Sequence, residues 1–271
     1  MNLKLINNFM SPMFYREIAP NSDASHIIFS FWEFRVNLPT PEPIVHEIFP
    51  DGCRSIFYYK NARFKTSALL VSSLGLESVN VPVFDGDVYW GMRVAPAACR
   101  ALLNDEMTSE QSRPAAEIPN LADFARDLTA KLDDCENFEA AISELETNVH
   151  QLKLEAIDER VVSAVRFVEE NHAQVKIDEI AAAAGLSRRQ FERRFLQSSG
   201  LTPKQYLRAR RLRATAIKLV ENAAQNWANR AAEMGFADQA HLSHEFNALT
   251  SRTPGAFAER VKQIEHGKLI K

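Results

Sequence analysis

The fold of the C-terminal half is decided by Ile177-Asp178-Glu179-Ile180-Ala181-Ala182-Ala183-Ala184-Gly185-Leu186-Ser187, followed by Arg188-Arg189-Gln190-Phe191-Glu192-Arg193-Arg194-Phe195. The alanines predict a short helix that can lie close to a neighbour, and Gly185 can adopt the left-handed conformation of a sharp turn. Ser187 is placed to cap a second helix, in which Phe191 and Phe195 share one face. A helix, a turn that contains glycine and a second helix are typical of a helix-turn-helix unit.

The same pattern recurs later in the chain at a nearly constant spacing. Phe191, Phe195, Thr202-Pro203 and Tyr206 recur 51 residues later as Leu242, Phe246, Thr253-Pro254 and Phe257, and Gly185 recurs as Gly235 after 50 residues. A repeat of this length indicates a duplicated supersecondary unit. Pro203 begins a connecting helix of roughly 18 residues, about 27 Å long. The sequence predicts an all-α region with two helix-turn-helix units joined by a long helix, whose length suits reading helices about one DNA turn, roughly 34 Å, apart.

Arginine side chains are expected on the outer face of the second helix in the first unit. With Phe191 and Phe195 toward the core, a helical wheel places Arg189 and Arg193 opposite them, where arginine can read guanine edges in a major groove. The second unit has Asp238 as its cap and no arginine on this face, so weaker base reading is expected there. The alternative is that these charges only solvate the helix. Candidate base contacts are Arg189, Glu192, Arg193, Gln239, His241 and His244, and candidate phosphate contacts are Arg188, Arg194, Lys204, Arg208 and Arg210.

Charge is distributed unevenly along the chain. The formal net charge of -3 alone argues against a nucleic-acid partner. However, residues 1–154 carry 13 Lys and Arg against 21 Asp and Glu, whereas residues 155–271 carry 19 against 14. Between Arg188 and Lys218 there are ten basic residues and one acid, Glu192. A basic stripe within one domain is the electrostatic footprint expected for phosphate binding, so charge per domain favours the partner that the net charge excludes.

The first 150 residues have a different pattern. Residues 1–100 are β-rich, because aromatic and β-branched clusters at 27–34 and 55–59 are separated by turns at 39–43, 50–52 and 85–87. Many short strands without intervening helices predict a sandwich or small barrel. Residues 119–150 change to a helical period in two runs, which predicts a helical hairpin that packs on the β domain or on a second copy. The apolar positions of these runs are Leu121, Phe124, Leu128 and Leu132, then Phe138, Ile142, Leu145 and Val149.

The C-terminal residues resemble the AraC/XylS family of bacterial transcription regulators over roughly residues 157–261. The matching motifs are Ile180-Ala181, Gly185-Leu186-Ser187, Phe191-Glu192-Arg193-Arg194-Phe195, Gly200-Leu201-Thr202-Pro203, Tyr206-Leu207, Arg210-Arg211-Leu212, Ala216, Ala231, Gly235-Phe236-Ala237-Asp238-Gln239, Phe246 and Thr253-Pro254. The resemblance implies a DNA-binding domain with two helix-turn-helix units, and base contacts from both second helices. Arg230 and Trp227 depart from the family pattern, which usually has an aliphatic residue and a smaller one there, so unusual packing is expected in the second unit.

The N-terminal part is similar to the cupin-like small β-barrel sensor domains that accompany this family, in a poorly characterised subtype. The similarity rests on Pro50-Asp51-Gly52 and on residues 91–103. The expected domains are a β-barrel sensor or dimerisation domain at 1–153 with the hairpin at about 119–150, an AraC-type DNA-binding domain at 154–265, and a tail at 266–271. Candidate effector-pocket residues are Phe31, Trp32, Phe57 and Tyr59.

Other classes of protein find little support in the sequence. A cupin-type metal enzyme would need a His-x-His pair with further ligands, whereas His26 and His46 are isolated and His241 and His244 lack a third ligand. No catalytic residue, metal or cofactor is therefore expected. No apolar run of 18 residues is present, and residues 1–10 lack a signal-peptide pattern. Three cysteines, 46 and 36 residues apart, suit neither disulfides nor a metal cluster, which favours a reducing cytoplasm.

The sequence thus predicts a cytoplasmic, sequence-specific DNA-binding transcriptional regulator that is controlled by a small-molecule effector or by dimerisation. Double-stranded DNA is the expected partner, with RNA polymerase, a small-molecule effector and a second copy of the chain as further candidates. The alternatives are a sensor protein whose helical domain contacts protein, and the cupin-type metal enzyme.

Overall fold

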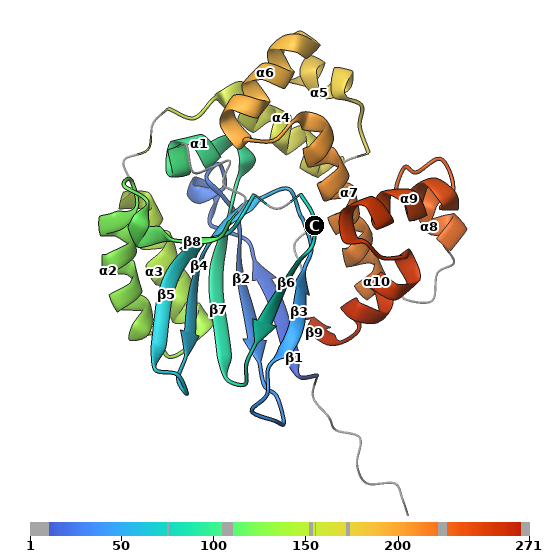
Figure 1. Cartoon of the computed structure of the whole chain (residues 1–271). Helices are drawn as coiled ribbons and strands as arrows, with labels where there is room; N and C mark the ends of the chain where they lie inside the picture. The colour runs from blue at the N-terminus through green and yellow to red at the C-terminus, as the bar shows by residue number, and fades with distance from the viewer. Residues whose placement is uncertain are drawn as a thin grey trace, which may run out of the picture.

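The computed structural model of the chain describes residues 11–74, 76–104, 111–151, 154, 156–171, 174–221 and 227–266. An N-terminal β-rich part is followed by helices that lie over one end and one side of it (Figure 1). The predicted two-part fold, mainly β and then all α, is confirmed. Of the predicted tail, only His266 lies among the described residues.

The N-terminal part contains a seven-stranded sheet and a separate two-stranded ribbon. The large sheet has the order β8-β5-β4-β7-β2-β1-β9, and β3 pairs with β6 in the ribbon. Its pairs are antiparallel except for β1 with β9. The strands are β1 (Met13–Ile18), β2 (Ile28–Val36), β3 (Ile44–Ile48), β4 (Arg54–Asn61), β5 (Thr66–Val71), β6 (Val79–Val83), β7 (Asp87–Val94), β8 (Arg113–Pro114) and β9 (Ile264–His266).

Two helices, α2 (Ala122–Asp133) and α3 (Phe138–Gln151), cover one face of the large sheet (Figure 1). Leu128, Leu132, Phe138 and Leu145 are buried there with side chains of β2, β4 and β7, together with α1 (Cys99–Leu103). Of the two predicted packing partners of the hairpin, its own β domain and a second copy of the chain, the structure therefore shows the β domain.

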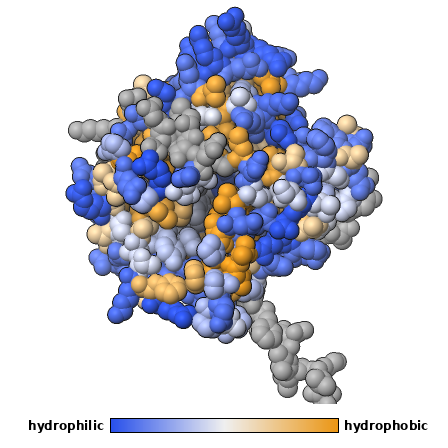
Figure 2. Space-filling view, in the orientation of Figure 1, coloured by the Kyte–Doolittle hydropathy of each residue, from blue (hydrophilic) through white to orange (hydrophobic). Residues whose placement is uncertain are grey.

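The ribbon lies over the opposite face of the sheet. Val83 of β6 packs with Met13, Phe34 and Val36 of the sheet, so the β-rich part is a partly closed barrel. The ribbon leaves Val45 and Ile48 of β3 and Val79 of β6 exposed. Figure 2 shows an apolar patch over these two strands.

The C-terminal region is helical, as its periodicity predicts. Its helices are α4 (Glu159–Glu170), α5 (Ile177–Ala183), α6 (Arg188–Ser199), α7 (Pro203–Glu221), α8 (Trp227–Glu233), α9 (Gln239–Thr250) and α10 (Pro254–Val261). Helices α4–α6 lie above the β-rich part and α8–α10 lie at its side, with α7 between them (Figure 1). The repeated apolar positions are buried in two separate cores, around Phe191 and Phe195 in the first and Leu242 and Phe246 in the second.

The end of the chain returns to the N-terminal sheet. Strand β9 pairs in parallel with β1, with Met13 opposite Ile264 and Tyr15 opposite His266. Nearby, Arg252 forms an ion pair with Glu47 at 2.5 Å, and the rings of Phe49 and Phe257 have centres 4.4 Å apart, so the second helical unit contacts the N-terminal part at several places.

Candidate nucleic-acid interface

Helix α6 presents two arginines to solvent because of its caps and its buried face. Gly185 has a φ of 65° in the turn before it, and the Ser187 hydroxyl accepts a hydrogen bond from the backbone N–H of Gln190. Phe191 and Phe195 point into the core. Arg189 and Arg193 are exposed on the other side, and neither forms an ion pair with a described residue. Both guanidinium groups are therefore available to a ligand, as the helical wheel predicts.

Glu192, the third candidate base contact on α6, is already engaged. Its carboxylate accepts a hydrogen bond from Arg188 Nε at 2.9 Å, and Arg188 Nη1 lies 3.4 Å from Asp178 of α5. The hydrogen bond that Arg188 donates to Glu192, followed by the charges of Asp178 and Glu192, raises the pKa of Arg188. A base contact by Glu192 would require this pair to open.

Helix α9 has the same arrangement without arginines. Gly235 has a φ of 72° in the preceding turn, and the Asp238 carboxylate accepts a hydrogen bond from the His241 N–H at 2.7 Å. Gln239, His241 and His244 are exposed, with His244 opposite buried Leu242 and Phe246, His241 on the flank and Gln239 at the N-terminal end of the helix. Their predicted contacts with bases remain predictions.

The beginnings of both second helices open onto one groove of about 520 Å³. Arg188 at the start of α6 and His241 near the start of α9 line it, and α7 supplies Lys204, Arg208 and Arg211 between them. Lys176 adds a fifth positive charge, whereas Asp178 and Glu245 are the acids of the lining. A groove that joins two helix starts and carries excess positive charge suits a phosphodiester backbone. Lys176 and Arg211 were missed by sequence reasoning, because the groove exists only once the two units are placed together.

The candidate phosphate contacts divide into two groups. Arg188, Lys204 and Arg208 line the groove, with Arg208 held by Glu245 at 2.6 Å. Arg194 lies away from it and is paired with Asp158 at 2.7 Å, so a phosphate contact by Arg194 would require that pair to open.

Arg210 differs from its prediction. It is buried and hydrogen-bonded to Glu169 of α4 and to the carbonyl oxygen of Asp51, and its guanidinium lies 5.6 Å from the ring centre of Phe29. The geometry does not support a phosphate contact by Arg210, because this side chain faces the N-terminal part instead of the groove.

The two departures in the second unit lie against each other. Arg230 is fully buried, and its guanidinium lies 5.4 Å from the ring centre of Trp227. The Trp227 ring covers the positive charge of Arg230, a charge that the usual aliphatic residue at this position lacks. The unusual packing expected for this unit is therefore present, and it leaves the exposed face of α9 intact.

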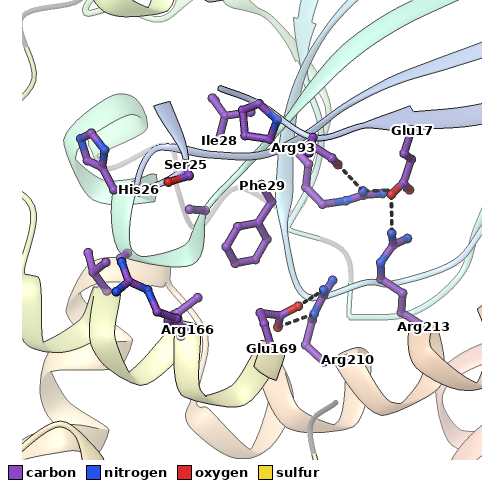
Figure 3. Close-up of a pocket in the computed structure, with 17 residues that line it drawn as sticks. Glu17, Ser25, His26, Ile28, Phe29, Arg93, Arg166, Glu169, Arg210 and Arg213 are labelled. Carbon is purple, nitrogen blue, oxygen red and sulfur yellow. Dashed lines mark hydrogen bonds and ion pairs between the residues drawn. The ribbon is translucent and has the colours of Figure 1, made fainter. Parts of the chain in front are cut away.

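A buried network of charges joins the N-terminal sheet to α7. The Glu17 carboxylate on β1 is fully buried and accepts hydrogen bonds from Arg93 of β7 at 3.0 Å and from Arg213 of α7 at 2.6 Å (Figure 3). Arg93 also donates to Asp51 at 2.5 Å. Burial raises the pKa of Glu17, but the charges of Arg93 and Arg213 outweigh it and hold this pKa at about 2. Sequence reasoning missed this network, because its members lie far apart in the chain.

The turn at Pro50-Asp51-Gly52 makes a second contact with α7. Gly52 has a φ of 79°, and a Cβ at this position would lie 2.9 Å from the ring of Tyr206. Tyr206 in turn donates its hydroxyl hydrogen bond to Glu169 at 2.8 Å. The sequence motif used for the N-terminal resemblance is therefore an interdomain contact.

We expect Gly52→Ala to lower the free energy of unfolding by more than the about 1–2 kcal/mol that an L side chain costs at positive φ, because the added Cβ would also press on the ring of Tyr206. Urea unfolding of the full chain measures this change. Gly86→Ala is the matched control, since Gly86 also has a φ of 79° but nothing lies within 4 Å of its Cβ position. Equal losses in both variants would mean that Tyr206 does not matter.

The candidate effector residues do not lie together. Phe31 is fully buried on the helix-covered face of the sheet with Tyr58 and Trp90. Trp32, Phe57 and Tyr59 are partly exposed. Trp32 and Phe57 have ring centres 5.9 Å apart, and Phe57 and Tyr59 are both in contact with Tyr89. Phe31 therefore belongs to the core, and the other three belong to an aromatic surface facing the ribbon.

His46 on the ribbon predicts a dependence of stability on pH. Its ring stacks on Phe34 with centres 4.5 Å apart, and burial, helped by the charge of Arg260, lowers its pKa to about 4. The unfolded chain then binds more protons than the folded chain, so stability present above pH 6.5 is lost as the pH falls toward 4. We expect a loss of about 1–2 kcal/mol by pH 5, at 1.36 kcal/mol per pKa unit.

Urea unfolding at pH 7 and pH 5 tests this expectation. His46→Gln should remove most of the difference between the two pH values, whereas His244→Gln on the exposed face of α9 should leave it unchanged. A difference that persists in His46→Gln would assign it to other groups.

The remaining features are possible metal sites and possible membrane-spanning helices. Among the described residues, no three His, Cys, Asp or Glu side chains are grouped so that they could hold a metal ion. In the same part of the chain, no helix is long and apolar enough to cross a membrane.

Comparison with known proteins places the helical region. Residues 180–260 match the family described as helix-turn-helix domain, and this range runs from α5 into α10. The fold and the paired helices thus define a helix-turn-helix DNA-binding protein with an N-terminal β-rich part. This match agrees with the resemblance of the C-terminal region to AraC-type domains, and the prediction of a DNA-binding transcriptional regulator is confirmed at this level. A comparison with curated proteins found no match.

Several solved structures are similar to the chain. One is a transcriptional regulator with an AraC-type DNA-binding domain from Chromobacterium violaceum, with 27% identity, 39% of this chain and 94% of that chain covered, and a TM-score of 0.36. Another is the DNA-binding domain of AdpA in complex with a target DNA, with 29% identity, 37% and 90% covered, and a TM-score of 0.34. A third is ToxT from Vibrio cholerae, with 12% identity, 82% and 95% covered, and a TM-score of 0.44.

Proposed function

We propose that this protein regulates transcription by binding one face of a DNA duplex with both helix-turn-helix units, and that it catalyses no reaction. The observation that carries the proposal is the shared basic groove, with the unpaired Arg189 and Arg193 of α6 beside it. The groove would hold the phosphate backbone, while α6 and α9 enter successive major grooves. Because α6 carries the arginines, it would supply most of the base recognition.

Equilibrium binding of the full chain to genomic DNA fragments tests the proposal. We expect fragment-selective binding that weakens steeply with salt, because each neutralised phosphate releases counterions and the slope of log K against log salt is about -0.9 per phosphate. A salt-insensitive or absent interaction with every fragment would instead favour a helical domain that contacts protein.

A small-molecule effector is the second part of the proposal, and a cavity of about 330 Å³ between the domains is its candidate site. Ile28, Phe29 and Val165 give it apolar walls, and Figure 3 shows Phe29 between His26 and Arg166 on one side and Arg93 on the other. His26 and Arg166 are exposed, and Arg166 forms no ion pair with a described residue. A ligand with an apolar body and one negative group would match these walls and charges.

Thermal unfolding of the full chain with decanoate tests this site. We expect decanoate to raise the unfolding temperature, with a smaller rise in Arg166→Gln and a full rise in Arg126→Gln, an exposed arginine on α2. Decylamine has the same chain length and the opposite charge. A rise with decylamine as large as that with decanoate, or a full rise in Arg166→Gln, would argue against an anion site.

The location and partners follow from this role. A DNA-binding regulator acts in the cytoplasm of a bacterial cell, beside RNA polymerase, and dimerisation would give it two half-sites. The apolar faces of α2 and α3 are buried on their own sheet, so a dimer would use a surface other than these faces.

A further inference from the structure

The basic groove contains two carboxylates, whose negative charges reduce its attraction for phosphate groups. Asp178 comes from α5 and Glu245 comes from α9, so they reach the groove from different helix-turn-helix units. Each one holds an arginine of the groove: Asp178 lies 3.4 Å from Arg188, and Glu245 lies 2.6 Å from Arg208. Both acids therefore occupy positions in which an incoming phosphate would contact the same arginines.

These pairs are poorly explained by fold stability. Arg188 and Asp178 are more than half exposed, and exposed ion pairs contribute about 0–1 kcal/mol. Glu245 is less exposed, but α9 is already anchored by Leu242 and Phe246 in its core. The positions of Asp178 and Glu245 therefore affect the binding of a ligand in the groove more than they affect the stability of the fold.

We propose that Asp178 and Glu245 weaken the binding of every duplex to the groove by standing in for backbone phosphates. The inference rests on the proposed function. A duplex must displace each carboxylate from its arginine and then lie beside the displaced negative charge. Only a duplex whose bases also bond to α6 and α9 recovers that cost, so the acids suppress binding to arbitrary sequence.

The charges around the groove agree with this role. Lys176 and Lys204 remain to attract a duplex, and neither forms an ion pair with a described residue. Glu245 also acts on Arg211, whose pKa burial lowers and the charge of Glu245 raises. One carboxylate on α9 therefore acts on two arginines of α7: it forms an ion pair with Arg208, and its charge favours the charged form of Arg211.

The test compares Asp178→Asn and Glu245→Gln with the wild-type full chain on two labelled duplexes. One duplex has arbitrary sequence and the other is a genomic fragment selected by the wild type. We expect each variant to bind the arbitrary duplex about three- to tenfold more tightly at ~0.1 M salt, where charges within a Debye length of ~10 Å still interact. The salt slope should steepen by about 0.9 per freed cation. Both duplexes should gain by a similar factor, so that the arbitrary duplex becomes bound at protein concentrations at which the wild type leaves it free.

Asp123→Asn is the control, because it removes one negative charge from an exposed ion pair on α2, where Asp123 lies 3.0 Å from Arg126. Thermal unfolding checks that Glu245→Gln remains folded, and the exposed Asp178 gives a second, independent variant. If the wild type binds with salt-sensitive selectivity but both groove variants behave like Asp123→Asn, the inference is overturned and the proposed function stands. If the wild type binds no duplex, both are overturned.

Discussion

Replacing Glu17 by alanine is expected to lower the free energy of unfolding by about 3–5 kcal/mol, the cost of removing one partner from a buried ion pair. Glu17 is fully buried between Arg93 and Arg213. Arg93 would keep its ion pair with Asp51, but Arg213 would lose a carboxylate 2.6 Å away in an environment that water reaches poorly. The variant should therefore also separate the unfolding of the two parts of the chain, which the wild type couples through this network.

Urea unfolding followed by tryptophan fluorescence measures the change. Glu139→Ala is the matched control, since Glu139 forms an ion pair with Arg16 at 2.8 Å but is largely exposed, where such pairs contribute about 0–1 kcal/mol. The wild type should also lose the contribution of Glu17 as the pH falls from 4.5 toward 2, because the folded pKa is about 2 and the unfolded chain binds the proton first. A Glu17→Ala variant no less stable than Glu139→Ala would show that the network does not hold the domains together.

The sequence predicts the local features of the helical region well. The caps at Ser187 and Asp238, the turns at Gly185 and Gly235 and the 51-residue repeat follow from residues close together in the chain, and the structure has them in those places. The exposed faces of α6 and α9 follow for the same reason, since a helical period fixes which side chains oppose the buried ones.

The contacts between the N-terminal part and the helical region could not be predicted from neighbouring residues in the sequence. Helix α7 carries arginines on two faces, each pair three residues apart: Arg208 and Arg211 line the groove, whereas Arg210 and Arg213 face Glu169 and Glu17. The helical period separates the two arginine faces of α7, but only the position of the N-terminal sheet shows which face is available to contact DNA. For that reason the sequence assigned Arg210 to a phosphate contact, whereas its side chain faces the N-terminal part. Phe31 and Trp32 are likewise adjacent in sequence, and only the packing of α2 and α3 decides which of them is core.

This two-faced helix gives a physical route between the domains. A ligand in the interdomain cavity would lie against Arg210 and Arg213, and one turn or less along α7 the groove begins at Arg208 and Arg211. Both helix-turn-helix units are attached to α7, and α10 is followed by the strand that pairs with β1. A shift of α7 against the sheet would therefore change the positions of α6 and α9, which must match successive major grooves of the duplex.

Replacing Arg193 by alanine is expected to cost about 1–3 kcal/mol of binding free energy on a selected genomic duplex and to relax the preference for one base pair. Arg193 lies at the middle of the outer face of α6, opposite Phe191 and Phe195, and no described residue competes for its guanidinium. A bidentate bond to guanine O6 and N7 is the contact that such a side chain makes best in a major groove.

Titration of the full chain against the selected duplex and an arbitrary one separates base reading from simple charge. The loss in Arg193→Ala should fall mainly on the selected duplex, because a phosphate contact would weaken both alike. Lys204→Ala is the comparison within the interface, since Lys204 lines the groove and should weaken both duplexes and reduce the salt slope by about 0.9. Arg126→Ala on α2 should change neither. If Arg193→Ala weakens both duplexes equally, Arg193 contacts the backbone, and the base-reading role of α6 must rest on Arg189 alone.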